Sequence, residues 1–294
     1  MLLDLVDVFA AGPLSGNPLA VVRGGEGLNG PAMLAITRWL GFSETTFLLP
    51  PTDPGADYSV RIFYPAGELP FAGHPTLGTA KTWLAAGGIP RARGRVVQQC
   101  GVGLVDVTVD AECLAFAAPP LLRGGRLTDE ERAEAIRVAG VPESAVIEAV
   151  HACNGPAWRL LRLESAAQVL AARPAAQAPV PTDIGLIGPC SPGADSDFEV
   201  RAFFADPQGR IVEDPVTGSL NAAAAQVLFG AGLAHGRYVA TQGRCTGADG
   251  RVVLTQDSDG TVWVAGRVRM VSQGGALAPG FHHPPTPSSE ENGE

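Results

Sequence analysis

The feature that most constrains the fold of this chain is an internal repeat. Residues 59–80, SVRIFYPAGELPFAGHPTLGTA, align without a gap over residues 199–220, EVRAFFADPQGRIVEDPVTGSL, at an offset of 140. Both segments have the pattern of a strand, a loop of equal length and a helix start that reads Pro-x-x-Gly-[Ser/Thr]. The matched positions are Val60/Val200, Arg61/Arg201, Phe63/Phe203, Pro75/Pro215, Gly78/Gly218 and the similar pair Thr79/Ser219. Such a repeat predicts two copies of one α/β unit.

Alternating and β-branched runs dominate both halves of the chain, and helical patterns are fewer. We therefore expect an α+β fold of two pseudo-symmetric domains, each a mixed β-sheet rolled around a central α-helix. Pro and Gly cluster in APPLLRGGR, residues 118–126, which is typical of a connection between units. The expected domains are residues 1–117 and 118–280, and the polar, proline-rich residues 281–294 are expected to be a mobile tail.

Charge and composition exclude several classes of function. The net charge is −9, and no Lys/Arg cluster forms the basic patch that a nucleic-acid partner requires. No apolar run approaches the ~18–20 residues of a membrane span, and the acidic N-terminus is a poor signal peptide. The five cysteines are scattered without a CxxC pair, which favours neither a disulfide framework nor a zinc site. A reduced, cytoplasmic compartment fits best, with neither nucleic acid nor membrane as a partner.

The two helix starts of the repeat carry polar residues at equivalent places, His74 and Asp214. We expect each to lie at or beside the N-cap, with proline at the first helical position and a glycine, Gly78 or Gly218, permitting a close approach. A helix start offers free N–H donors and a partial positive charge, which bind anions. One such start alone is most simply an ordinary capped helix. Two of them, facing each other across a cleft between domains, would form a site for a carboxylate substrate.

An acid precedes an apolar strand in GFSETTFLLP, residues 41–50. Glu44 lies either at an exposed strand end or in a pocket where burial raises its pKa, and taken alone the pattern favours the exposed position. Glu68, six residues before His74, is a second candidate acid. Ser219 lacks the Gly-x-Ser-x-Gly pattern of a hydrolase nucleophile, and no glycine cluster has the setting of a dinucleotide-binding motif.

Four motifs together resemble the PhzF-like family, named for the phenazine-biosynthesis isomerase, across roughly residues 4–275. They are DVFAAGPLSGNPLAVV, SETTF, RIFYPAGELPFAGHPTLGTA and VRAFFADPQGRIVEDPVTGSLNAAAA. The resemblance implies the diaminopimelate epimerase-like fold, an active site between the domains, no cofactor, no metal and commonly a homodimer. It also implies that Glu44 is the catalytic acid/base. The residues that would orient the substrate or line the site are Gly73, His74, Asp214, Gly218 and Ser219.

The activity that the resemblance implies is a cofactor-free isomerisation that moves a proton within a small carboxylated substrate, similar to that of trans-2,3-dihydro-3-hydroxyanthranilate isomerase. One glutamate can remove and return the proton if its pKa is near neutrality and domain closure excludes water. A second hypothesis is an epimerase or racemase that uses His74 and Asp214 as two bases, although epimerases of this fold have a cysteine pair at the helix starts and this chain does not. A third is a non-catalytic protein of the same fold that binds small anions.

The chain departs from the family pattern after Gln-Gly in TQGRCTGADGRVVL, residues 241–254. Ala248 and Asp249 stand where the family usually has Arg-Pro. If that arginine positions a substrate, Arg244 or Arg251 would have to replace it, or the substrate differs. The departure concerns the identity of the substrate more than the type of reaction.

Overall fold

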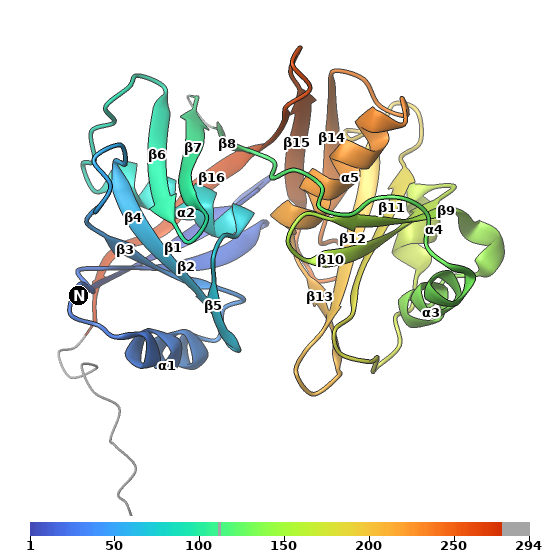
Figure 1. Cartoon of the computed structure of the whole chain (residues 1–294), viewed down its shortest axis with the longest axis horizontal. Helices are drawn as coiled ribbons and strands as arrows, with labels where there is room; N and C mark the ends of the chain where they lie inside the picture. Colours follow the sequence, from blue (N-terminus) through green and yellow to red (C-terminus); the bar gives the residue numbers. More distant parts are fainter. Residues whose placement is uncertain (111–112, 278–294) are drawn as a thin grey trace, which may run out of the picture.

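The structure is a computed structural model that describes residues 1–110 and 113–277. Figure 1 shows two lobes side by side, with the first half of the chain in one lobe and most of the second half in the other. The strands of the first half are β1 (Leu2–Val8), β2 (Asn17–Arg23), β3 (Thr45–Leu49), β4 (Tyr58–Tyr64), β5 (Gly67–Leu69), β6 (Arg95–Cys100), β7 (Gly103–Val109) and β8 (Cys113–Ala117). Its helices are α1 (Gly30–Leu40) and α2 (Gly73–Ala85).

The second half repeats this series after two additional helices, α3 and a 3₁₀ helix. Its helices are α3 (Asp129–Ala139), the 3₁₀ helix η1 (Glu143–Ala145), α4 (Ala166–Ala171) and α5 (Gly218–Gly230). Its strands are β9 (Val146–Cys153), β10 (Ala157–Leu163), β11 (Asp183–Pro189), β12 (Phe198–Ala205), β13 (Ile211–Asp214), β14 (Arg237–Gln242), β15 (Gly250–Gln256) and β16 (Val262–Ala276). None of the helices within the described ranges is long and apolar enough to cross a membrane.

Local sequence signals set the ends of the peripheral helices. Asn29 caps α1 by accepting a hydrogen bond from the backbone, and α1 ends at Gly41, whose positive φ only glycine adopts at little cost. Thr128 and Glu131 form a reciprocal capping box at the start of α3, and Gly140 ends that helix in the same way. These helices therefore begin and end where short-range hydrogen bonding favours it.

The two lobes share one strand topology, which is the structural form of the repeat. In the first lobe β2 pairs with β3 in parallel and β4 pairs with β6 in parallel, while β1–β2, β3–β4 and β6–β7 are antiparallel. In the second lobe the parallel pairs are β10–β11 and β12–β14, and the antiparallel pairs are β9–β10, β11–β12 and β14–β15. Each lobe is thus a mixed sheet, as the sequence predicted.

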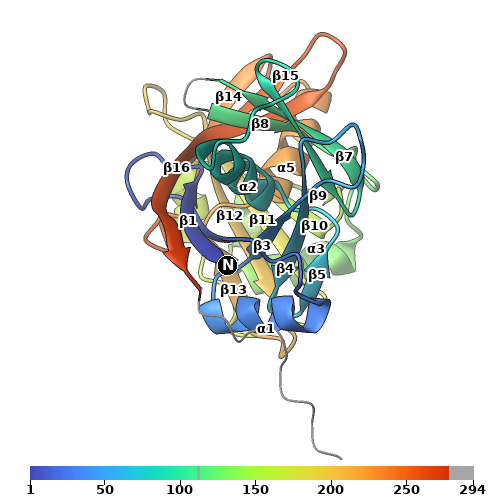
Figure 2. The same cartoon turned by 90° about the vertical axis from the view of Figure 1, so that its left-hand side faces the viewer.

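Helices α2 and α5 lie inside the strands of their own lobes. Helix α2 contacts β1, β2, β3, β4, β6, β7, β8 and β16, and α5 contacts β9, β10, β15 and β16. Figure 2 shows α2 enclosed in this way. Small side chains make the enclosure possible: residues 222–225 of α5 are alanines with no exposed surface, and a Cβ on Gly78 of α2 would overlap the Leu19 side chain. The expected mixed sheet rolled around a central helix is confirmed.

Strand β16 joins the two lobes. It pairs antiparallel with β15 of the second half, and also with β8 and β1 of the first half. A cut at residue 117 would leave this strand with the second lobe, although much of its pairing is with the first. The domain limits 1–117 and 118–280 stay a prediction, and the expected tail, residues 281–294, lies outside the described residues.

The repeat contains a five-residue insertion that the ungapped alignment hides. Strand β4 pairs Ile62 with Leu69 of β5, and β12 pairs Ala202 with Asp214 of β13. The offset is 202 − 62 = 140 on the first strand of each hairpin, but 214 − 69 = 145 on the second. Helices α2 and α5, each 13 residues long, also begin 218 − 73 = 145 residues apart. The alignment at 140 is therefore wrong beyond the first strand, because the second hairpin has a longer turn.

This shift changes which residues correspond at the two helix starts. Gly218 is the counterpart of Gly73, since each is the first residue of its central helix, and Ser219 is the counterpart of His74. Asp214 is the last residue of β13 and precedes its helix by four positions. The predicted equivalence of His74 with Asp214 is therefore wrong. It arose because Pro and Gly happen to have the same spacing at both helix starts.

The caps of the central helices also differ from the prediction. The N-cap of α2 is Ala72 and that of α5 is Thr217, and neither makes a side-chain capping bond. His74 is the second helical residue and Pro75 the third, while Asp214 lies outside the helix. Helix ends without side-chain caps leave backbone N–H groups available to other acceptors.

Candidate active site

Glu44 and His74 face each other where β3 begins and α2 begins. Glu44 Oε2 lies 3.5 Å from His74 Nε2, and the two side chains are 19% and 6% exposed. Both atoms are buried and neither has a hydrogen-bond partner within the described structure. An unsatisfied buried polar atom is costly, so a pair of them at one point is typical of a place that a ligand completes.

Burial makes both groups neutral near pH 7. Desolvation and, to a smaller extent, the negative charge of Asp214 together raise the pKa of Glu44 to about 8, against the opposing effect of the Ser43 hydroxyl. Desolvation lowers the pKa of His74 to about 3. The contact between Glu44 and His74 is therefore one between a carboxyl group and a neutral imidazole, and not an ion pair.

Strand β3 and helix α2 are fastened together next to this contact. The Thr79 hydroxyl of α2 donates to the Pro75 carbonyl at 2.7 Å and lies at hydrogen-bond distance, 2.8 Å, from the Thr46 hydroxyl. Thr46 and Thr79 are completely buried. Two β-branched threonines thus fix the strand that carries Glu44 against the first turns of the helix that carries His74.

Asp214 is held at the end of β13 by two side chains. Asn17 Nδ2 donates to Asp214 Oδ1 at 3.0 Å, and the Thr217 hydroxyl donates to Oδ2 at 2.5 Å. Burial raises the pKa of Asp214 to about 6, and these two hydrogen bonds limit the rise because they stabilise the carboxylate. Near pH 7 Asp214 is therefore mostly ionised. Its negative charge helps to keep Glu44 protonated, because it raises the pKa of Glu44.

The first residues of the two central helices meet at the same place. A Cβ atom on Gly218 would lie 3.4 Å from both Gly73 Cα and His74 N. A Cβ on Gly73 would lie 2.5 Å from the Phe116 ring. The backbones of two helix N-termini therefore lie next to each other, and their N–H groups and aligned dipoles favour an anion there. The sequence prediction of paired helix starts is therefore realised, with Gly73 in the place expected for Gly78.

Ser219 lies in the first turn of α5 and is anchored by two side chains. Trp158 Nε1 donates to Ser219 Oγ at 3.1 Å, and Asn154 Nδ2 donates to the Ser219 carbonyl at 2.9 Å. Because the hydroxyl already accepts from the indole, its own proton remains available to an acceptor. Among the residues that the structure describes, Asn154 Oδ1 is buried and has no hydrogen-bond partner.

Two amides that sequence reasoning missed organise the second helix start. Gln242 Nε2 donates to the Asp214 carbonyl at 3.0 Å and to the Thr217 hydroxyl at 2.9 Å, and its Oε1 accepts from Thr217 N and Asn221 Nδ2. Asn17 reaches Asp214 from a segment 197 residues earlier. Their motifs, Gln-Gly and Gly-Asn-Pro, were visible, but no spacing rule connects either to Asp214.

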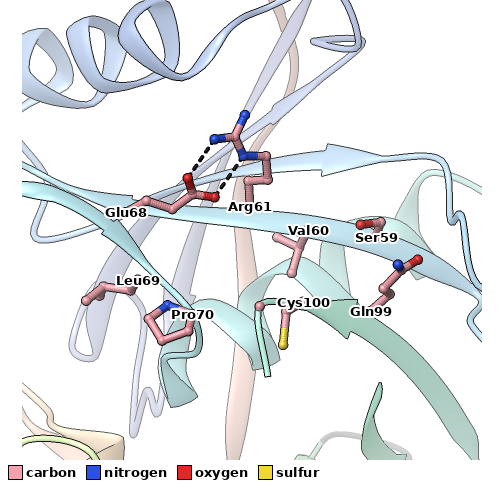
Figure 3. Close-up of a pocket in the computed structure, with 9 residues that line it drawn as sticks. Ser59, Val60, Arg61, Glu68, Leu69, Pro70, Gln99 and Cys100 are labelled. Carbon is pink, nitrogen blue, oxygen red and sulfur yellow. Dashed lines mark hydrogen bonds and ion pairs between the residues drawn. The ribbon is translucent and has the colours of Figure 1, made fainter. Parts of the chain in front are cut away.

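Glu68 is not brought into this site. It forms two hydrogen bonds with Arg61, of 2.8 and 2.6 Å, and lines a cavity of about 480 Å³ between β4, β5 and β6. Figure 3 shows this ion pair on one wall of the cavity and Cys100 on another. The cavity lining includes none of Glu44, His74 and Asp214. The Arg61–Glu68 ion pair has a counterpart in the second lobe, the ion pair between Arg201 and Glu213.

In residues 241–254, where the chain departs from the family pattern, both arginines form ion pairs. Arg244 NH1 lies 3.2 Å from the buried Glu199 carboxylate, and its Nε lies 3.8 Å from Asp249. Arg251 also donates to Asp249. Within the described structure, neither of the two arginines considered as replacements forms an ion pair with Glu44 or Asp214.

The described residues contain no group of three or more His, Cys, Asp and Glu side chains arranged to hold a metal ion. Two lobes with the same topology, each around a buried helix, define the epimerase-like fold, and relatives of this chain named below are isomerases. The chain belongs to the PhzF-like family: the PhzC-PhzF family model, "Phenazine biosynthesis-like protein", matches residues 6–274.

Individual relatives agree with this assignment. The chain is 34% identical over 226 residues to "Antisense-enhancing sequence 1" of Schizosaccharomyces pombe, covering 73% of this chain and 75% of that protein. It is 33% identical over 217 residues to trans-2,3-dihydro-3-hydroxyanthranilate isomerase of Pseudomonas aeruginosa, with the same coverage of 73% and 75%. A solved structure of a predicted epimerase from Pseudomonas aeruginosa is 27% identical, with a TM-score of 0.74, covering 94% of this chain and 99% of that one.

Proposed function

We propose that this isomerase moves a proton within a small carboxylated substrate, without a cofactor, and that Glu44 is the acid/base that carries the proton. One observation supports this above the others: the Glu44 carboxyl group is buried, has an unpartnered oxygen 3.5 Å from His74, and has its pKa raised to about 8. A carboxyl group with a pKa near the working pH both accepts and donates a proton efficiently. At pH 7 about one molecule in ten has Glu44 ionised and ready to act as a base.

The two helix starts are proposed to bind the substrate carboxylate. Their N–H groups lack side-chain caps and converge where Gly73 and Gly218 approach each other. Donors aimed at a fixed point also stabilise negative charge that develops when a carbon acid loses its proton. The Ser219 hydroxyl, oriented by Trp158, is proposed as a further donor.

His74 and Asp214 are proposed to orient the reacting group and to set the state of Glu44. His74 is neutral, so its unpartnered Nε2 can hydrogen-bond to a substrate or to Glu44 without adding charge. Asp214 is ionised near pH 7, and its charge adds to the desolvation that keeps Glu44 protonated. The proton that Glu44 takes from one carbon returns to another position of the same substrate, so the reaction is balanced without an oxidant or reductant.

The two-base alternative has less support from this arrangement. The counterpart of His74 is Ser219, so His74 and Asp214 do not occupy equivalent helix starts. Both oxygens of Asp214 accept hydrogen bonds, and the pKa of His74 is lowered to about 3, which makes the imidazole a weak base. The homodimeric state, the cytoplasmic location and the absence of a nucleic-acid partner stay predictions.

Solvent exchange tests the proposal. The wild-type protein is incubated in D₂O with trans-2,3-dihydro-3-hydroxyanthranilate and a panel of small carboxylated metabolites, and deuterium incorporation is followed by NMR. Glu44→Gln should reduce the exchange rate of an accepted compound by at least about 10²-fold while that compound still binds. Glu68→Gln is the matched control and should exchange like the wild type, because Glu68 pairs with Arg61 outside the site.

Undiminished exchange in Glu44→Gln would remove Glu44 from the mechanism. Loss of exchange in His74→Asn but not in Glu44→Gln would favour the two-base hypothesis. Ligands that raise the melting temperature of the wild type but never exchange would favour the protein that only binds small anions.

A further inference from the structure

Asn17, the first residue of β2, lies where the two lobes meet and has no exposed surface. Its side-chain Nδ2 donates to Asp214 Oδ1 at 3.0 Å and to the Val216 carbonyl at 2.9 Å. Its Oδ1 accepts from the Ser43 hydroxyl at 3.4 Å. One amide thus connects the segment immediately before Glu44 in the first lobe with the segment immediately before α5 in the second.

The hydrogen-bonding capacity of Asn17 matches its three partners. An asparagine side chain has two N–H donors and one carbonyl acceptor, and here both donors and the acceptor are in use. Aspartate at this position would lack both donors and would add a negative charge beside Asp214. A hydroxyl side chain would supply one donor where two acceptors, Asp214 Oδ1 and the Val216 carbonyl, need one each.

The position of Asn17 is itself fixed by the turn before β2. The Asp7 carboxylate accepts from Ser15 N at 3.1 Å and from Gly16 N at 2.7 Å. Gly16 lies so close to the backbone of Val8 that any Cβ there would overlap the Val8 carbonyl. The amide of Asn17 is therefore presented to the second lobe from a rigid strand end.

We infer that Asn17 is a positioning residue that fixes the place of Asp214 relative to Glu44 across the junction of the two lobes. The importance of this arrangement for catalysis rests on the proposed function. The arrangement itself involves only the carboxyl groups of Glu44 and Asp214, and no substrate. Asn17 touches Asp214 directly and reaches Glu44 only through Ser43, so it acts through these groups and not on the reacting atoms.

The consequence of losing Asn17 follows from the charges around the two acids. The titratable groups that act on them are each other, His74 beside Glu44, and Glu213 beside Asp214. Asn17 stabilises the Asp214 carboxylate, so its removal should raise the pKa of Asp214. Asp214 would then be charged over a narrower pH range and held less closely, and its effect on Glu44 would weaken. The pKa of Glu44 should fall, and the two apparent pKa values should move toward each other.

The test is a titration of side-chain carboxyl ¹³C signals in the labelled full-length protein, without any substrate. The signals of the two acids are assigned by their disappearance in Glu44→Gln and Asp214→Asn. Asn17→Leu nearly preserves the volume of the side chain and removes all three hydrogen bonds; Asn17→Ala is a second variant in case the first does not fold. In either variant the separation between the two apparent pKa values should shrink.

Asn29→Ala is the control, because it removes a part-buried hydrogen bond that an asparagine side chain accepts from Ala32 N, at the N-cap of α1 and away from both acids. It should lower thermal stability without moving either titration. An unchanged separation in a folded Asn17 variant, or an equal change in Asn29→Ala, would overturn the inference. Neither outcome depends on which substrate the enzyme accepts, so failure here is distinguishable from failure of the exchange experiment.

Discussion

Gly218 lies against Gly73, and a Cβ atom added to Gly218 would be 3.4 Å from the Gly73 Cα atom. The two residues are the first of α5 and the first of α2, and 145 positions separate them in the chain. This approach of two backbones brings two sets of helix N–H donors to one point. The atoms nearest to a Cβ on Gly218 belong to the backbone of Gly73 and His74, which cannot move aside as a flexible side chain could. The room beside Gly218 is therefore set by the position of the two backbones.

Alanine substitutions at these two glycines should have different effects on stability. Gly73→Ala would place a methyl group 2.5 Å from the Phe116 ring, so we expect it to destabilise the fold by about 1–3 kcal/mol. Gly218→Ala meets its neighbours at 3.4 Å and should cost less, while its methyl group occupies space beside the helix N–H donors. Urea unfolding checks the order, and ligand binding to folded Gly218→Ala should be weaker than to the wild type. Equal losses of stability in Gly73→Ala and Gly218→Ala would contradict the predicted order.

The raised pKa of Glu44 predicts a particular dependence of stability on pH. Because the pKa is about 8 in the folded state and about 4.5 in the unfolded state, the folded protein holds this proton more tightly. The resulting contribution to stability is complete below pH 4.5 and is lost as the pH rises through about 8. Glu44→Gln removes this dependence of stability on pH. The free energy of unfolding that depends on this proton is about 1.4 kcal/mol for each unit by which the pKa is shifted.

The measurement is denaturant unfolding of both proteins at several pH values. Relative to the wild type, Glu44→Gln should become progressively more stable between pH 4.5 and 8. Glu68→Gln, in which the substituted carboxyl is half-exposed, serves as the control for a general effect of removing one acid. A constant difference between Glu44→Gln and the wild type across this range would show that Glu44 titrates normally in the folded protein.

The repeated Arg–Glu pairs of the two lobes should differ in their contribution to stability. Arg201 and Glu213 are 5% and 14% exposed, whereas Arg61 and Glu68 are 33% and 42% exposed. Glu213→Gln leaves a buried guanidinium without its counter-charge and should destabilise by about 3–5 kcal/mol. Glu68→Gln should cost about 0–1 kcal/mol because water screens the exposed pair. The free energy of unfolding of each variant checks this, and similar losses would mean that burial is not the deciding factor.

The candidate site was partly predictable from the chain itself. Glu44 was indicated by an acid at the start of an apolar strand, and the position of His74 by its helix-start motif. The correspondence with Asp214 was misread because matching Pro and Gly residues at an offset of 140 concealed a turn that is five residues longer in the second copy. The two alignments are distinguished by the strand register, which depends on hydrogen bonds between neighbouring strands, and by the starts of the two central helices.

Asn17 and Gln242 were not predictable from local patterns. Each makes its contacts with residues that are distant in the sequence, and an amide in a Gly-Asn-Pro or Gln-Gly motif is compatible with many partners. The low exposure of Glu44 was not predictable either: taken alone, the sequence pattern favoured an exposed strand end, because an acid at a strand start is more often solvated. Its burial depends on how two lobes close around one point, which no single segment encodes.

The sequence by itself determined the elements and the family: alternating strands, caps at Asn29 and Thr128, glycine ends at Gly41 and Gly140, and motifs that match over most of the chain. These features depend on neighbours within a few residues, where backbone sterics and hydrogen bonding are decided locally. Only the tertiary structure decided that Glu44 and Asp214 are largely withdrawn from water near each other, that Gly73 faces Gly218, and that Asn17 lies between the lobes. Desolvation and close approach are set by the packing of remote segments, and the shifted pKa values follow from that packing.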